Sequence, residues 1–273
     1  MCSDVPPASV KALRHVAALS SGAPLDPALR VTLNFHPDRA LILGALAVSG
    51  SYLSQFATGT SNGGLTAHPG GDRWRWESRI FGGAYDEAPG QMRPVYGALN
   101  FRQKAVGAAP RFGSAHLRLT SDVLSRTSFC YPDSVFEPAA FGVAARMSLI
   151  ELAEADQQDA LDDYIEAQVH GPVRLDRDVE ALVLDPSYRS TEVELTARRL
   201  PCPVEWHAGF RLSVDELRRY PDFRGQRYVD LGVEVAVDGW LTPPVIGDAV
   251  ALGKYDLQDL KRVWHYLARF GTG

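Results

Sequence analysis

The sequence predicts an α+β fold, with antiparallel sheets and flanking helices. Strand-like segments with alternating or β-branched residues are mixed with helical segments, and they lack the regular strand–helix alternation that builds parallel sheets. No repeat, low-complexity tract or clear linker divides the 273 residues. We therefore expect a single domain over residues 1–273, with a core at about 25–212 and a C-terminal extension at 213–273.

Three elements are expected in the first 50 residues. Apolar residues recur at helical intervals within 6–19 and prolines precede them, which predicts a helix. The β-branched run VTLNF at 31–35 predicts a strand. The mostly apolar segment 38–50 predicts a second helix, which Gly50 could end.

Residues 51–85 are rich in glycine. This segment holds seven glycines in 35 residues, mixed with hydroxyl side chains and several aromatic residues. Glycine lets another molecule approach the backbone closely, and the aromatic content argues against a flexible linker. We expect a long, ordered loop that contributes to a binding site.

The rest of the chain contains mostly strand signals. Strands are expected at 95–101, 114–119, 128–131, 162–173, 178–186, 202–212 and 227–239, and helices at 139–158 and 256–270. Residues 191–200 fit either a helix or a strand. Ser213 followed by Glu216 has the spacing of a capping box, which predicts that a helix starts there.

Composition and charge narrow the function classes. The net charge of −5 disfavours non-specific binding to nucleic acid or to acidic membranes. No stretch approaches about 18 consecutive apolar residues, and the N-terminus lacks the pattern of a secretory signal. We expect a cytoplasmic protein, and export that uses no cleaved signal stays open. Three distant cysteines without CxxC spacing predict reduced thiols rather than a zinc site or a disulfide framework.

The letters HPDR follow the expected strand at 31–35. In a helical co-chaperone module His-Pro-Asp joins two antiparallel helices, and the preceding strand argues against that context here. One interpretation is that His36 and Asp38 cap the helix that starts near Arg39. Another is that His36 and Arg39 serve a ligand at the strand end. His36 and His68 match no compact metal-ligand spacing and no acidic cluster supports them, so no metal is expected.

The stretch YIEAQVHG places a carboxylate and an amide on one strand face. Glu166 and Gln168 are two residues apart, so both side chains point to the same side of a strand, opposite apolar neighbours. Two interpretations remain open. This face could be a solvent-exposed sheet edge, or it could carry a carboxylate that points into a cleft.

Several longer motifs together resemble one family. LNFHPDR, SQFATGTSNGG, WESRIFGGAYD, VYGALNF, RFGSAHLRL and YIEAQVHG are similar to the bacterial and fungal family named domain of unknown function 3626. The resemblance covers about residues 30–212. It indicates a family without indicating a chemistry.

A looser resemblance concerns the order of these motifs, which is similar to that of ADP-ribosyltransferases. In those enzymes an early strand ends in a residue that holds the adenosine side of NAD. A polar glycine-rich loop, an aromatic nicotinamide-pocket residue and a catalytic glutamate follow. The matching positions are His36, TGTSNGG, Tyr96 and Glu166. Arginine-modifying toxins carry Glu-x-Glu, whereas this chain has Glu166 and Gln168, and it has no Ser-Thr-Ser triplet. The resemblance implies an ADP-ribosyltransferase-like fold around an NAD cleft.

The resemblance also implies roles for individual residues. Glu166 would stabilise the positive ribose of the transition state, Tyr96 would stack on nicotinamide and His36 would hold a ribose hydroxyl. The expected NAD-binding residues are Arg39, Gly59, Thr60, Ser61, Asn62, Gly97, Arg111, Ser114 and Gln168.

The resemblance further implies an NAD-dependent mono-ADP-ribosyltransferase, a toxin-like effector with NAD as substrate and an unknown acceptor. Three alternatives remain. They are an NAD glycohydrolase, another nucleotide or glycoside hydrolase, and a non-catalytic nucleotide-binding or interaction module.

Overall fold

The computed structural model describes residues 6–39, 42–59 and 66–271. Its helices and strands, in chain order, are α1 (Pro7–Leu19), β1 (Val31–Phe35), α2 (Ile42–Ser49), β2 (Ser51–Tyr52), α3 (Gln55–Thr58), α4 (Asp72–Ile80), β3 (Val95–Leu99), β4 (Ala115–Leu119), β5 (Thr127–Tyr131), β6 (Ala140–Val143), α5 (Leu149–Ala155), β7 (Ile165–Val169), β8 (Val173–Arg174), β9 (Val179–Leu184), α6 (Glu192–Ala197), β10 (Val204–Trp206), β11 (Leu212–Ser213), α7 (Val214–Leu217), α8 (Gln226–Val235), β12 (Trp240–Leu241), α9 (Pro243–Ala251) and α10 (Leu257–Phe270). Two short 3-10 helices, η2 (Pro110–Phe112) and η4 (Ser134–Phe136), also border the site described below.

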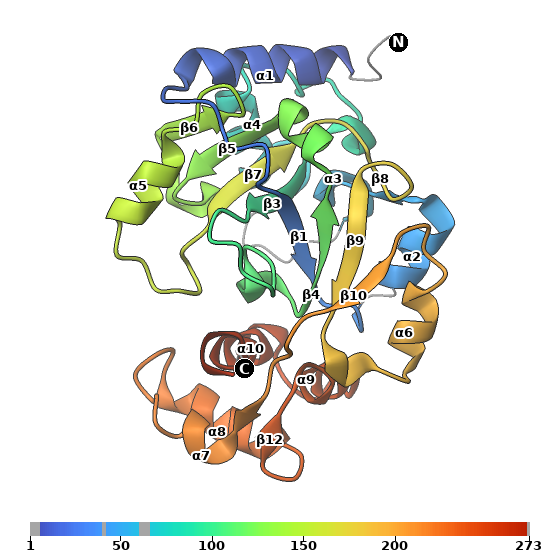
Figure 1. Ribbon diagram of the computed structural model, residues 1–273. Coiled ribbons are helices and arrows are strands. Elements are labelled where there is room, and N and C mark those ends of the chain that lie inside the picture. Colours follow the sequence, from blue (N-terminus) through green and yellow to red (C-terminus); the bar gives the residue numbers. More distant parts are fainter. Residues whose placement is uncertain (1–5, 40–41, 60–65, 272–273) are drawn as a thin grey trace.

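An eight-stranded sheet forms the centre of the protein, in the order β10-β9-β4-β1-β3-β7-β5-β6 (Figure 1). Neighbouring strands pair antiparallel, except for β9 and β10, which pair parallel. The predicted α+β class with antiparallel pairing is therefore confirmed. The expected helix at 6–19 and the strand at 31–35 form as predicted, and residues 191–200 contain the helix α6.

The two faces of the sheet pack against different helices. On one face, Phe35, Leu99 and Ala167 lie in the main apolar core, to which α2, α5 and α6 contribute. On the other face, α1 and α4 cover the β5–β6–β7 end, where Trp76 and Phe81 are buried. Alternate residues of one strand therefore enter two separate environments, as the period of a strand requires.

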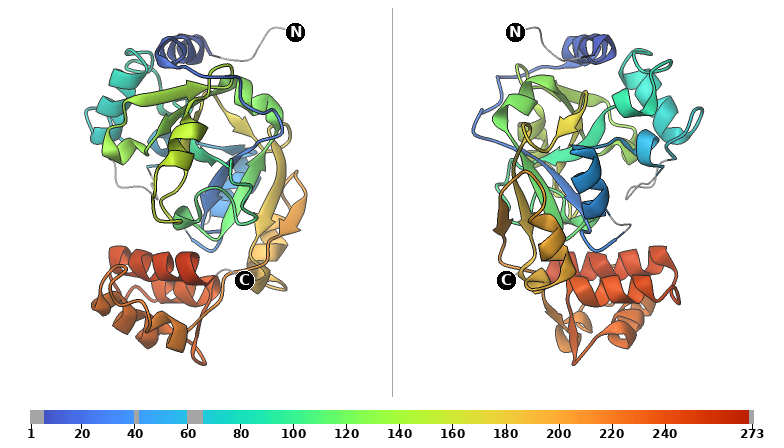
Figure 2. Two further views of the ribbon diagram at one scale, coloured as in Figure 1. Left: turned by 60° about the vertical axis from the view of Figure 1, so that its left-hand side comes forward. Right: turned by 90° about the vertical axis from the view of Figure 1, so that its right-hand side faces the viewer.

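The C-terminal segment has an apolar cluster of its own. Trp264 and Leu267 of α10 pack there with Val229 of α8 and Ile246 of α9. These helices, coloured orange to red, lie together at one end of the molecule, opposite α1 (Figure 2). The indole Nε1 of Trp264 donates to the carbonyl of Pro110 at 3.0 Å, which joins α10 to η2.

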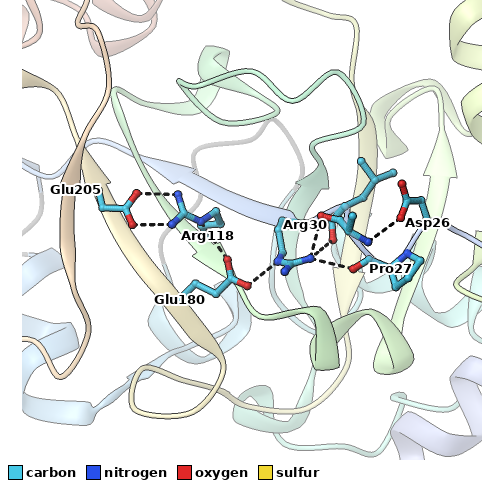
Figure 3. A network of polar contacts seen from close by, with 8 residues as sticks. Asp26, Pro27, Arg30, Arg118, Glu180 and Glu205 are labelled. Atoms are coloured by element: carbon cyan, nitrogen blue, oxygen red, sulfur yellow. Dashed lines mark hydrogen bonds and ion pairs between the residues drawn. The ribbon is translucent and has the colours of Figure 1, made fainter.

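A ladder of ion pairs links the outer strands of the sheet (Figure 3). Arg118 on β4 donates to both oxygens of Glu205 on β10, at 2.9 and 2.7 Å, and to Glu180 on β9 at 3.1 Å. Glu180 also accepts from Arg30 at 2.6 Å. Because these side chains are partly exposed, water screens the pairs and each contributes little stability.

Two predictions gave the wrong type of secondary structure. The expected strand at 227–239 is instead the helix α8, because packing against α7 and α10 outweighs the alternating pattern. Gly232 allows that packing, since a Cβ there would lie 2.7 Å from Leu217. The first part of the expected helix at 139–158 is instead β6, which pairs with β5 and completes that edge of the sheet.

The glycine-rich segment is also more regular than expected. It contains β2, α3 and the nine-residue helix α4 rather than one long loop. The backbone N–H of Asp72 donates to Thr66 Oγ1 at 2.9 Å, which satisfies a donor at the start of α4. Helix α2, expected over 38–50, is described from Ile42 to Ser49.

Candidate functional site

Strand β7 places Glu166 in the interior of the protein. The strand lies between β3 and β5, and its apolar residues Ile165, Ala167 and Val169 are fully buried in the main core. On the opposite face, Glu166 is only 7% exposed and Gln168 is completely buried. The interpretation of this face as a solvent-exposed sheet edge is therefore wrong.

Both carboxylate oxygens of Glu166 are held by hydrogen-bond donors. Ser134 Oγ, at the start of η4, donates to Oε2 at 2.8 Å. Gln168 Nε2 donates to Oε1 at 3.0 Å. The guanidinium of Arg73 lies 3.9 Å from Oε1 and donates to Ser134 Oγ at 2.7 Å. Glu166 thus has a fixed orientation, with a buried cation beside it.

The charge of Glu166 depends on opposing effects. Burial has the largest effect and raises the pKa of this carboxyl, and Asp133 raises it as well. Arg73 and the hydrogen bonds from Ser134 and Gln168 lower it, but the net result is a raised pKa. Every donor that touches the carboxylate favours its ionised form. A carboxylate that is desolvated yet surrounded by donors suits electrostatic work on a positive ligand.

Helix α4 contributes a second buried carboxylate. Glu77 is fully buried, accepts from Arg93 at 2.6 Å and from the hydroxyl of Tyr96 at 2.8 Å. Burial raises its pKa to about 7, against the opposing effects of Arg93 and the Tyr96 hydrogen bond. The guanidinium of Arg73 lies over the Tyr96 ring, 4.0 Å from its centre. Arg73 therefore lies between Tyr96, Glu77 and Glu166.

A chain of buried hydrogen bonds runs away from Glu166 along the same face. The side-chain oxygen of Gln168 accepts from Ser128 Oγ at 2.9 Å, and Ser128 is bonded to His170 Nε2 at 2.8 Å. The other ring nitrogen of His170 is bonded to the hydroxyl of Tyr85 at 2.7 Å. Since Gln168 is held by Ser128, its amide is fixed with the nitrogen toward Glu166.

Cys130, a further neighbour of Glu166, is not a reactive thiol. Cys130 Sγ donates to Glu166 Oε1 at 3.7 Å and is fully buried. Burial and the nearby carboxylate raise its pKa well above the ordinary value for a thiol. Cys130 and Cys202 are both free thiols, as the sequence predicts.

His36 lies at the other end of this sheet face, against the C-terminal helices. Thr32 of β1 aligns through Ala98 with Glu166, and His36 is four residues further, about 13 Å along a strand. Its ring meets Trp264 edge-on, with centres 4.7 Å apart. Burial lowers the pKa of His36 well below its usual value, with added effects from Arg39, His265 and Lys261.

Asp38 contacts Tyr188 and helix α9, and the backbone carbonyl of Arg39 accepts from the N–H of Ile42 at 3.2 Å. Asp38 accepts from the hydroxyl of Tyr188 at 2.9 Å, and its carboxylate packs against Gly247 of α9. Residues 40 and 41 lie outside the described residues, so the interpretation that His36 and Asp38 cap the next helix stays a prediction. The Nε of Arg39 is buried and has no hydrogen-bond partner among the described residues.

The remaining expected binding residues are spread over the molecule. Gly97 points to the main core, where a Cβ would lie 2.5 Å from Leu33, so it permits close packing of β3 on β1. Ser114 is fully buried before β4, and β4 is separated from β7 by β1 and β3. Gly59 ends α3 with a left-handed backbone. Thr60, Ser61 and Asn62 lie outside the described residues.

The structure therefore brings Glu166, Gln168 and Tyr96 together, with three residues that the sequence did not single out. Arg73 and Glu77 come from α4, and Ser134 comes from η4. The signal that could have found two of them is the segment RWRWES, in which Arg73 and Glu77 are four residues apart and so share one helix face.

In the part of the chain that the structure describes, no group of three or more His, Cys, Asp or Glu side chains could hold a metal ion. Among the same residues, every helix is too short or too polar to cross a membrane.

Comparison with known proteins gives a family. A family model described as protein of unknown function (DUF3626) matches residues 30–150 and 143–270, so the chain belongs to this family. No curated protein matches the chain. Among solved structures, the chain is similar to that of Thermus sp. 2.9 DarT in complex with NAD+, at 14% identity and a TM-score of 0.39. The match covers 68% of this chain and 98% of the DarT chain, and at this TM-score it carries no argument about fold or activity.

Proposed function

We propose that this member of the DUF3626 family is an NAD-dependent ADP-ribosyltransferase whose catalytic carboxylate is Glu166. One observation carries the proposal. Glu166 is a buried carboxylate on a central strand, with both oxygens held by donors and Arg73 3.9 Å away. The order of motifs in the sequence, from His36 through Tyr96 to Glu166, supports the same assignment.

The proposed reaction needs a fixed negative charge. The bond between ribose C1′ and the nicotinamide nitrogen breaks, nicotinamide leaves with the electron pair, and positive charge spreads over C1′ and the ring oxygen. A preorganised carboxylate stabilises this charge more than it stabilises neutral ribose, which lowers the barrier. The acceptor then forms a bond to C1′ and gives up its proton, for which Glu166 is the nearest base in this proposal.

Arg73 and Tyr96 have positioning roles in this account. Arg73 donates to Ser134, which in turn donates to Glu166, so its charge and its hydrogen bond both favour ionised Glu166. One face of the Tyr96 ring is covered by the Arg73 guanidinium. Tyr96 therefore helps to hold Arg73 and Glu77 in place. Nicotinamide could stack only on the other face of the Tyr96 ring.

The same carboxylate could serve hydrolysis, with water as the acceptor. NAD labelled in the adenine moiety distinguishes the outcomes. Free ADP-ribose together with nicotinamide identifies a glycohydrolase, whereas label on a macromolecule or small-molecule acceptor identifies a transferase. Intact NAD after incubation with folded protein and candidate acceptors would contradict the proposal and favour a non-catalytic module.

A glycoside hydrolase is less well supported. That reaction uses two carboxyl groups that flank one bond. Here Arg73 lies between Glu77 and Glu166, so the two buried carboxyl groups face a cation of the protein.

A further inference from the structure

Positively charged side chains surround a buried histidine of α10, His265, on the side of the helix that faces the sheet. We name Arg111, Arg224, Lys261, Arg262 and His265 the cationic cluster. His265 is completely buried, and both of its ring nitrogens lack a hydrogen-bond partner among the described residues. The Nε atoms of Arg111 and Arg224 are also buried without a partner in the part of the chain that is described.

Positively charged side chains surround His265. Arg111 and Arg224 share one carboxylate, Asp162. Asp133 is the carboxylate that acts on Lys261. Two arginines thus share a single carboxylate, and burial together with Arg111, Arg224, Lys261 and Arg262 lowers the pKa of His265 far below its usual value.

Leaving these groups unsatisfied is costly. Each buried donor without a partner costs about 1–3 kcal/mol, and neighbouring like charges repel one another. A buried water could satisfy some donors, but it would leave the excess positive charge in place. A bound anion with several acceptor oxygens would accept hydrogen bonds from these donors and would also offset the positive charge. Arginine forks and a histidine N–H suit phosphate oxygens in particular.

The cluster lies on the same side of the sheet as Glu166. Ser134 donates to Glu166, and its neighbour Asp133 accepts from Tyr164 and acts on Lys261. The turn at Asp133 and Ser134 therefore separates the carboxylate from the cationic cluster. His36 borders the cluster from β1, because Lys261 and His265 both act on its charge.

We propose that the cationic cluster binds a diphosphate group, with α10 supplying Lys261 and His265. This inference rests on the proposed function in one respect: the diphosphate would be that of NAD, with its nicotinamide ribose at Glu166. The C-terminal helices are then part of the substrate site. Free nucleotides or ADP-ribose carry the same diphosphate, so the chemistry of the site is defined independently of the reaction.

Isothermal titration calorimetry with inorganic pyrophosphate and with ADP-ribose tests the site, with adenosine as a phosphate-free control ligand. We expect both phosphate compounds to bind, and adenosine to bind at least tenfold more weakly than ADP-ribose. Lys261→Gln and His265→Leu should each raise the dissociation constant for pyrophosphate at least tenfold, about 1.4 kcal/mol. Lys254→Gln removes an exposed lysine of the same unit, which pairs with Glu234, and should leave binding unchanged.

Thermal melting separates a binding role from a structural one. His265→Leu replaces a buried ring without partners by an apolar side chain, so the unliganded variant should melt at or above the temperature of the wild type. No heat from pyrophosphate with wild-type protein would overturn the site, as would unchanged dissociation constants in both variants. Pyrophosphate binding without nicotinamide release from NAD would keep the site and reject the proposed reaction.

Discussion

Replacing Glu166 by glutamine removes one negative charge and keeps the shape of the side chain. In the wild type, Oε1 accepts from Gln168 and Oε2 accepts from Ser134. A glutamine amide has one oxygen and one NH₂ group, so one of these two donors would face another donor. The substitution therefore changes both the charge near the substrate and one buried hydrogen bond.

The effect on catalysis follows from the lost charge. A carboxylate about 4 Å from a unit positive charge contributes roughly 4 kcal/mol at an effective dielectric constant of about 20. The transition state carries only part of a unit charge, so we expect a loss of at least about 2.7 kcal/mol. At about 1.36 kcal/mol per decade, that is a rate reduction of about 10² or more.

The effect on stability follows from the changed hydrogen bonds and ion pair. The substitution removes the free-energy cost of burying the charge of Glu166. It also leaves Arg73 without the negative charge of its partner, and it leaves one buried donor unsatisfied. An unsatisfied buried donor costs about 1–3 kcal/mol, which is a fall of several degrees in melting temperature for a chain of this size. The variant should still fold at 25 °C.

The assay is nicotinamide release from NAD, measured beside a thermal melt of each protein. Glu180→Gln is the matched control, because Glu180 lies on β9 of the same sheet, is partly exposed and pairs with Arg30 and Arg118 rather than with Glu166. It should keep wild-type turnover. Wild-type turnover in folded Glu166→Gln would refute the assignment of this residue and remove most of the support for the enzyme.

Three further predictions concern other residues. Arg73 lowers the pKa of Glu166, so Arg73→Gln should move the acidic limb of the kcat/KM profile to higher pH, and an unmoved limb would contradict the ion pair. Burial lowers the pKa of His116 to about 3, so the unfolded state binds more protons around and below pH 6.5 and stability falls as pH falls. Relative to His116→Gln, the wild type should lose about 1.6 kcal/mol of unfolding free energy between pH 6.5 and pH 5 in denaturant titrations, and equal losses would argue against this. Ser213 accepts from the N–H of Glu216 at 3.1 Å, so Ser213→Ala should cost about 1 kcal/mol of unfolding free energy in the same titrations, whereas a cost near zero would show that the cap contributes nothing.

The sequence predicted best where local signals and packing agree. Strand β1 and helix α10 form near their expected ends, since their periodicities match the faces that they bury. Residues 227–239 alternate like a strand, yet most of them form α8, because the C-terminal cluster offers a helix-packing surface. Such a surface is made by α7, α9 and α10 together, and no local window of sequence contains it.

The candidate site was also predictable only in part. Alternation within YIEAQV was enough to predict that Glu166 and Gln168 share a face opposite the core. The partners of Glu166 come from α4 and from η4, which are distant in sequence, so only the fold reveals Arg73 and Ser134. The contact of His36 with Trp264 is likewise tertiary, because it joins residues 228 positions apart.

The central claim is that this protein breaks the bond between ribose and nicotinamide in NAD. The most direct measurement is a time course of nicotinamide formation when the purified full chain is incubated with millimolar NAD, next to a sample without protein. The account predicts nicotinamide formation that is proportional to protein concentration. No nicotinamide above the protein-free sample, from folded protein supplied with candidate acceptors and shown by calorimetry to bind NAD, would contradict it.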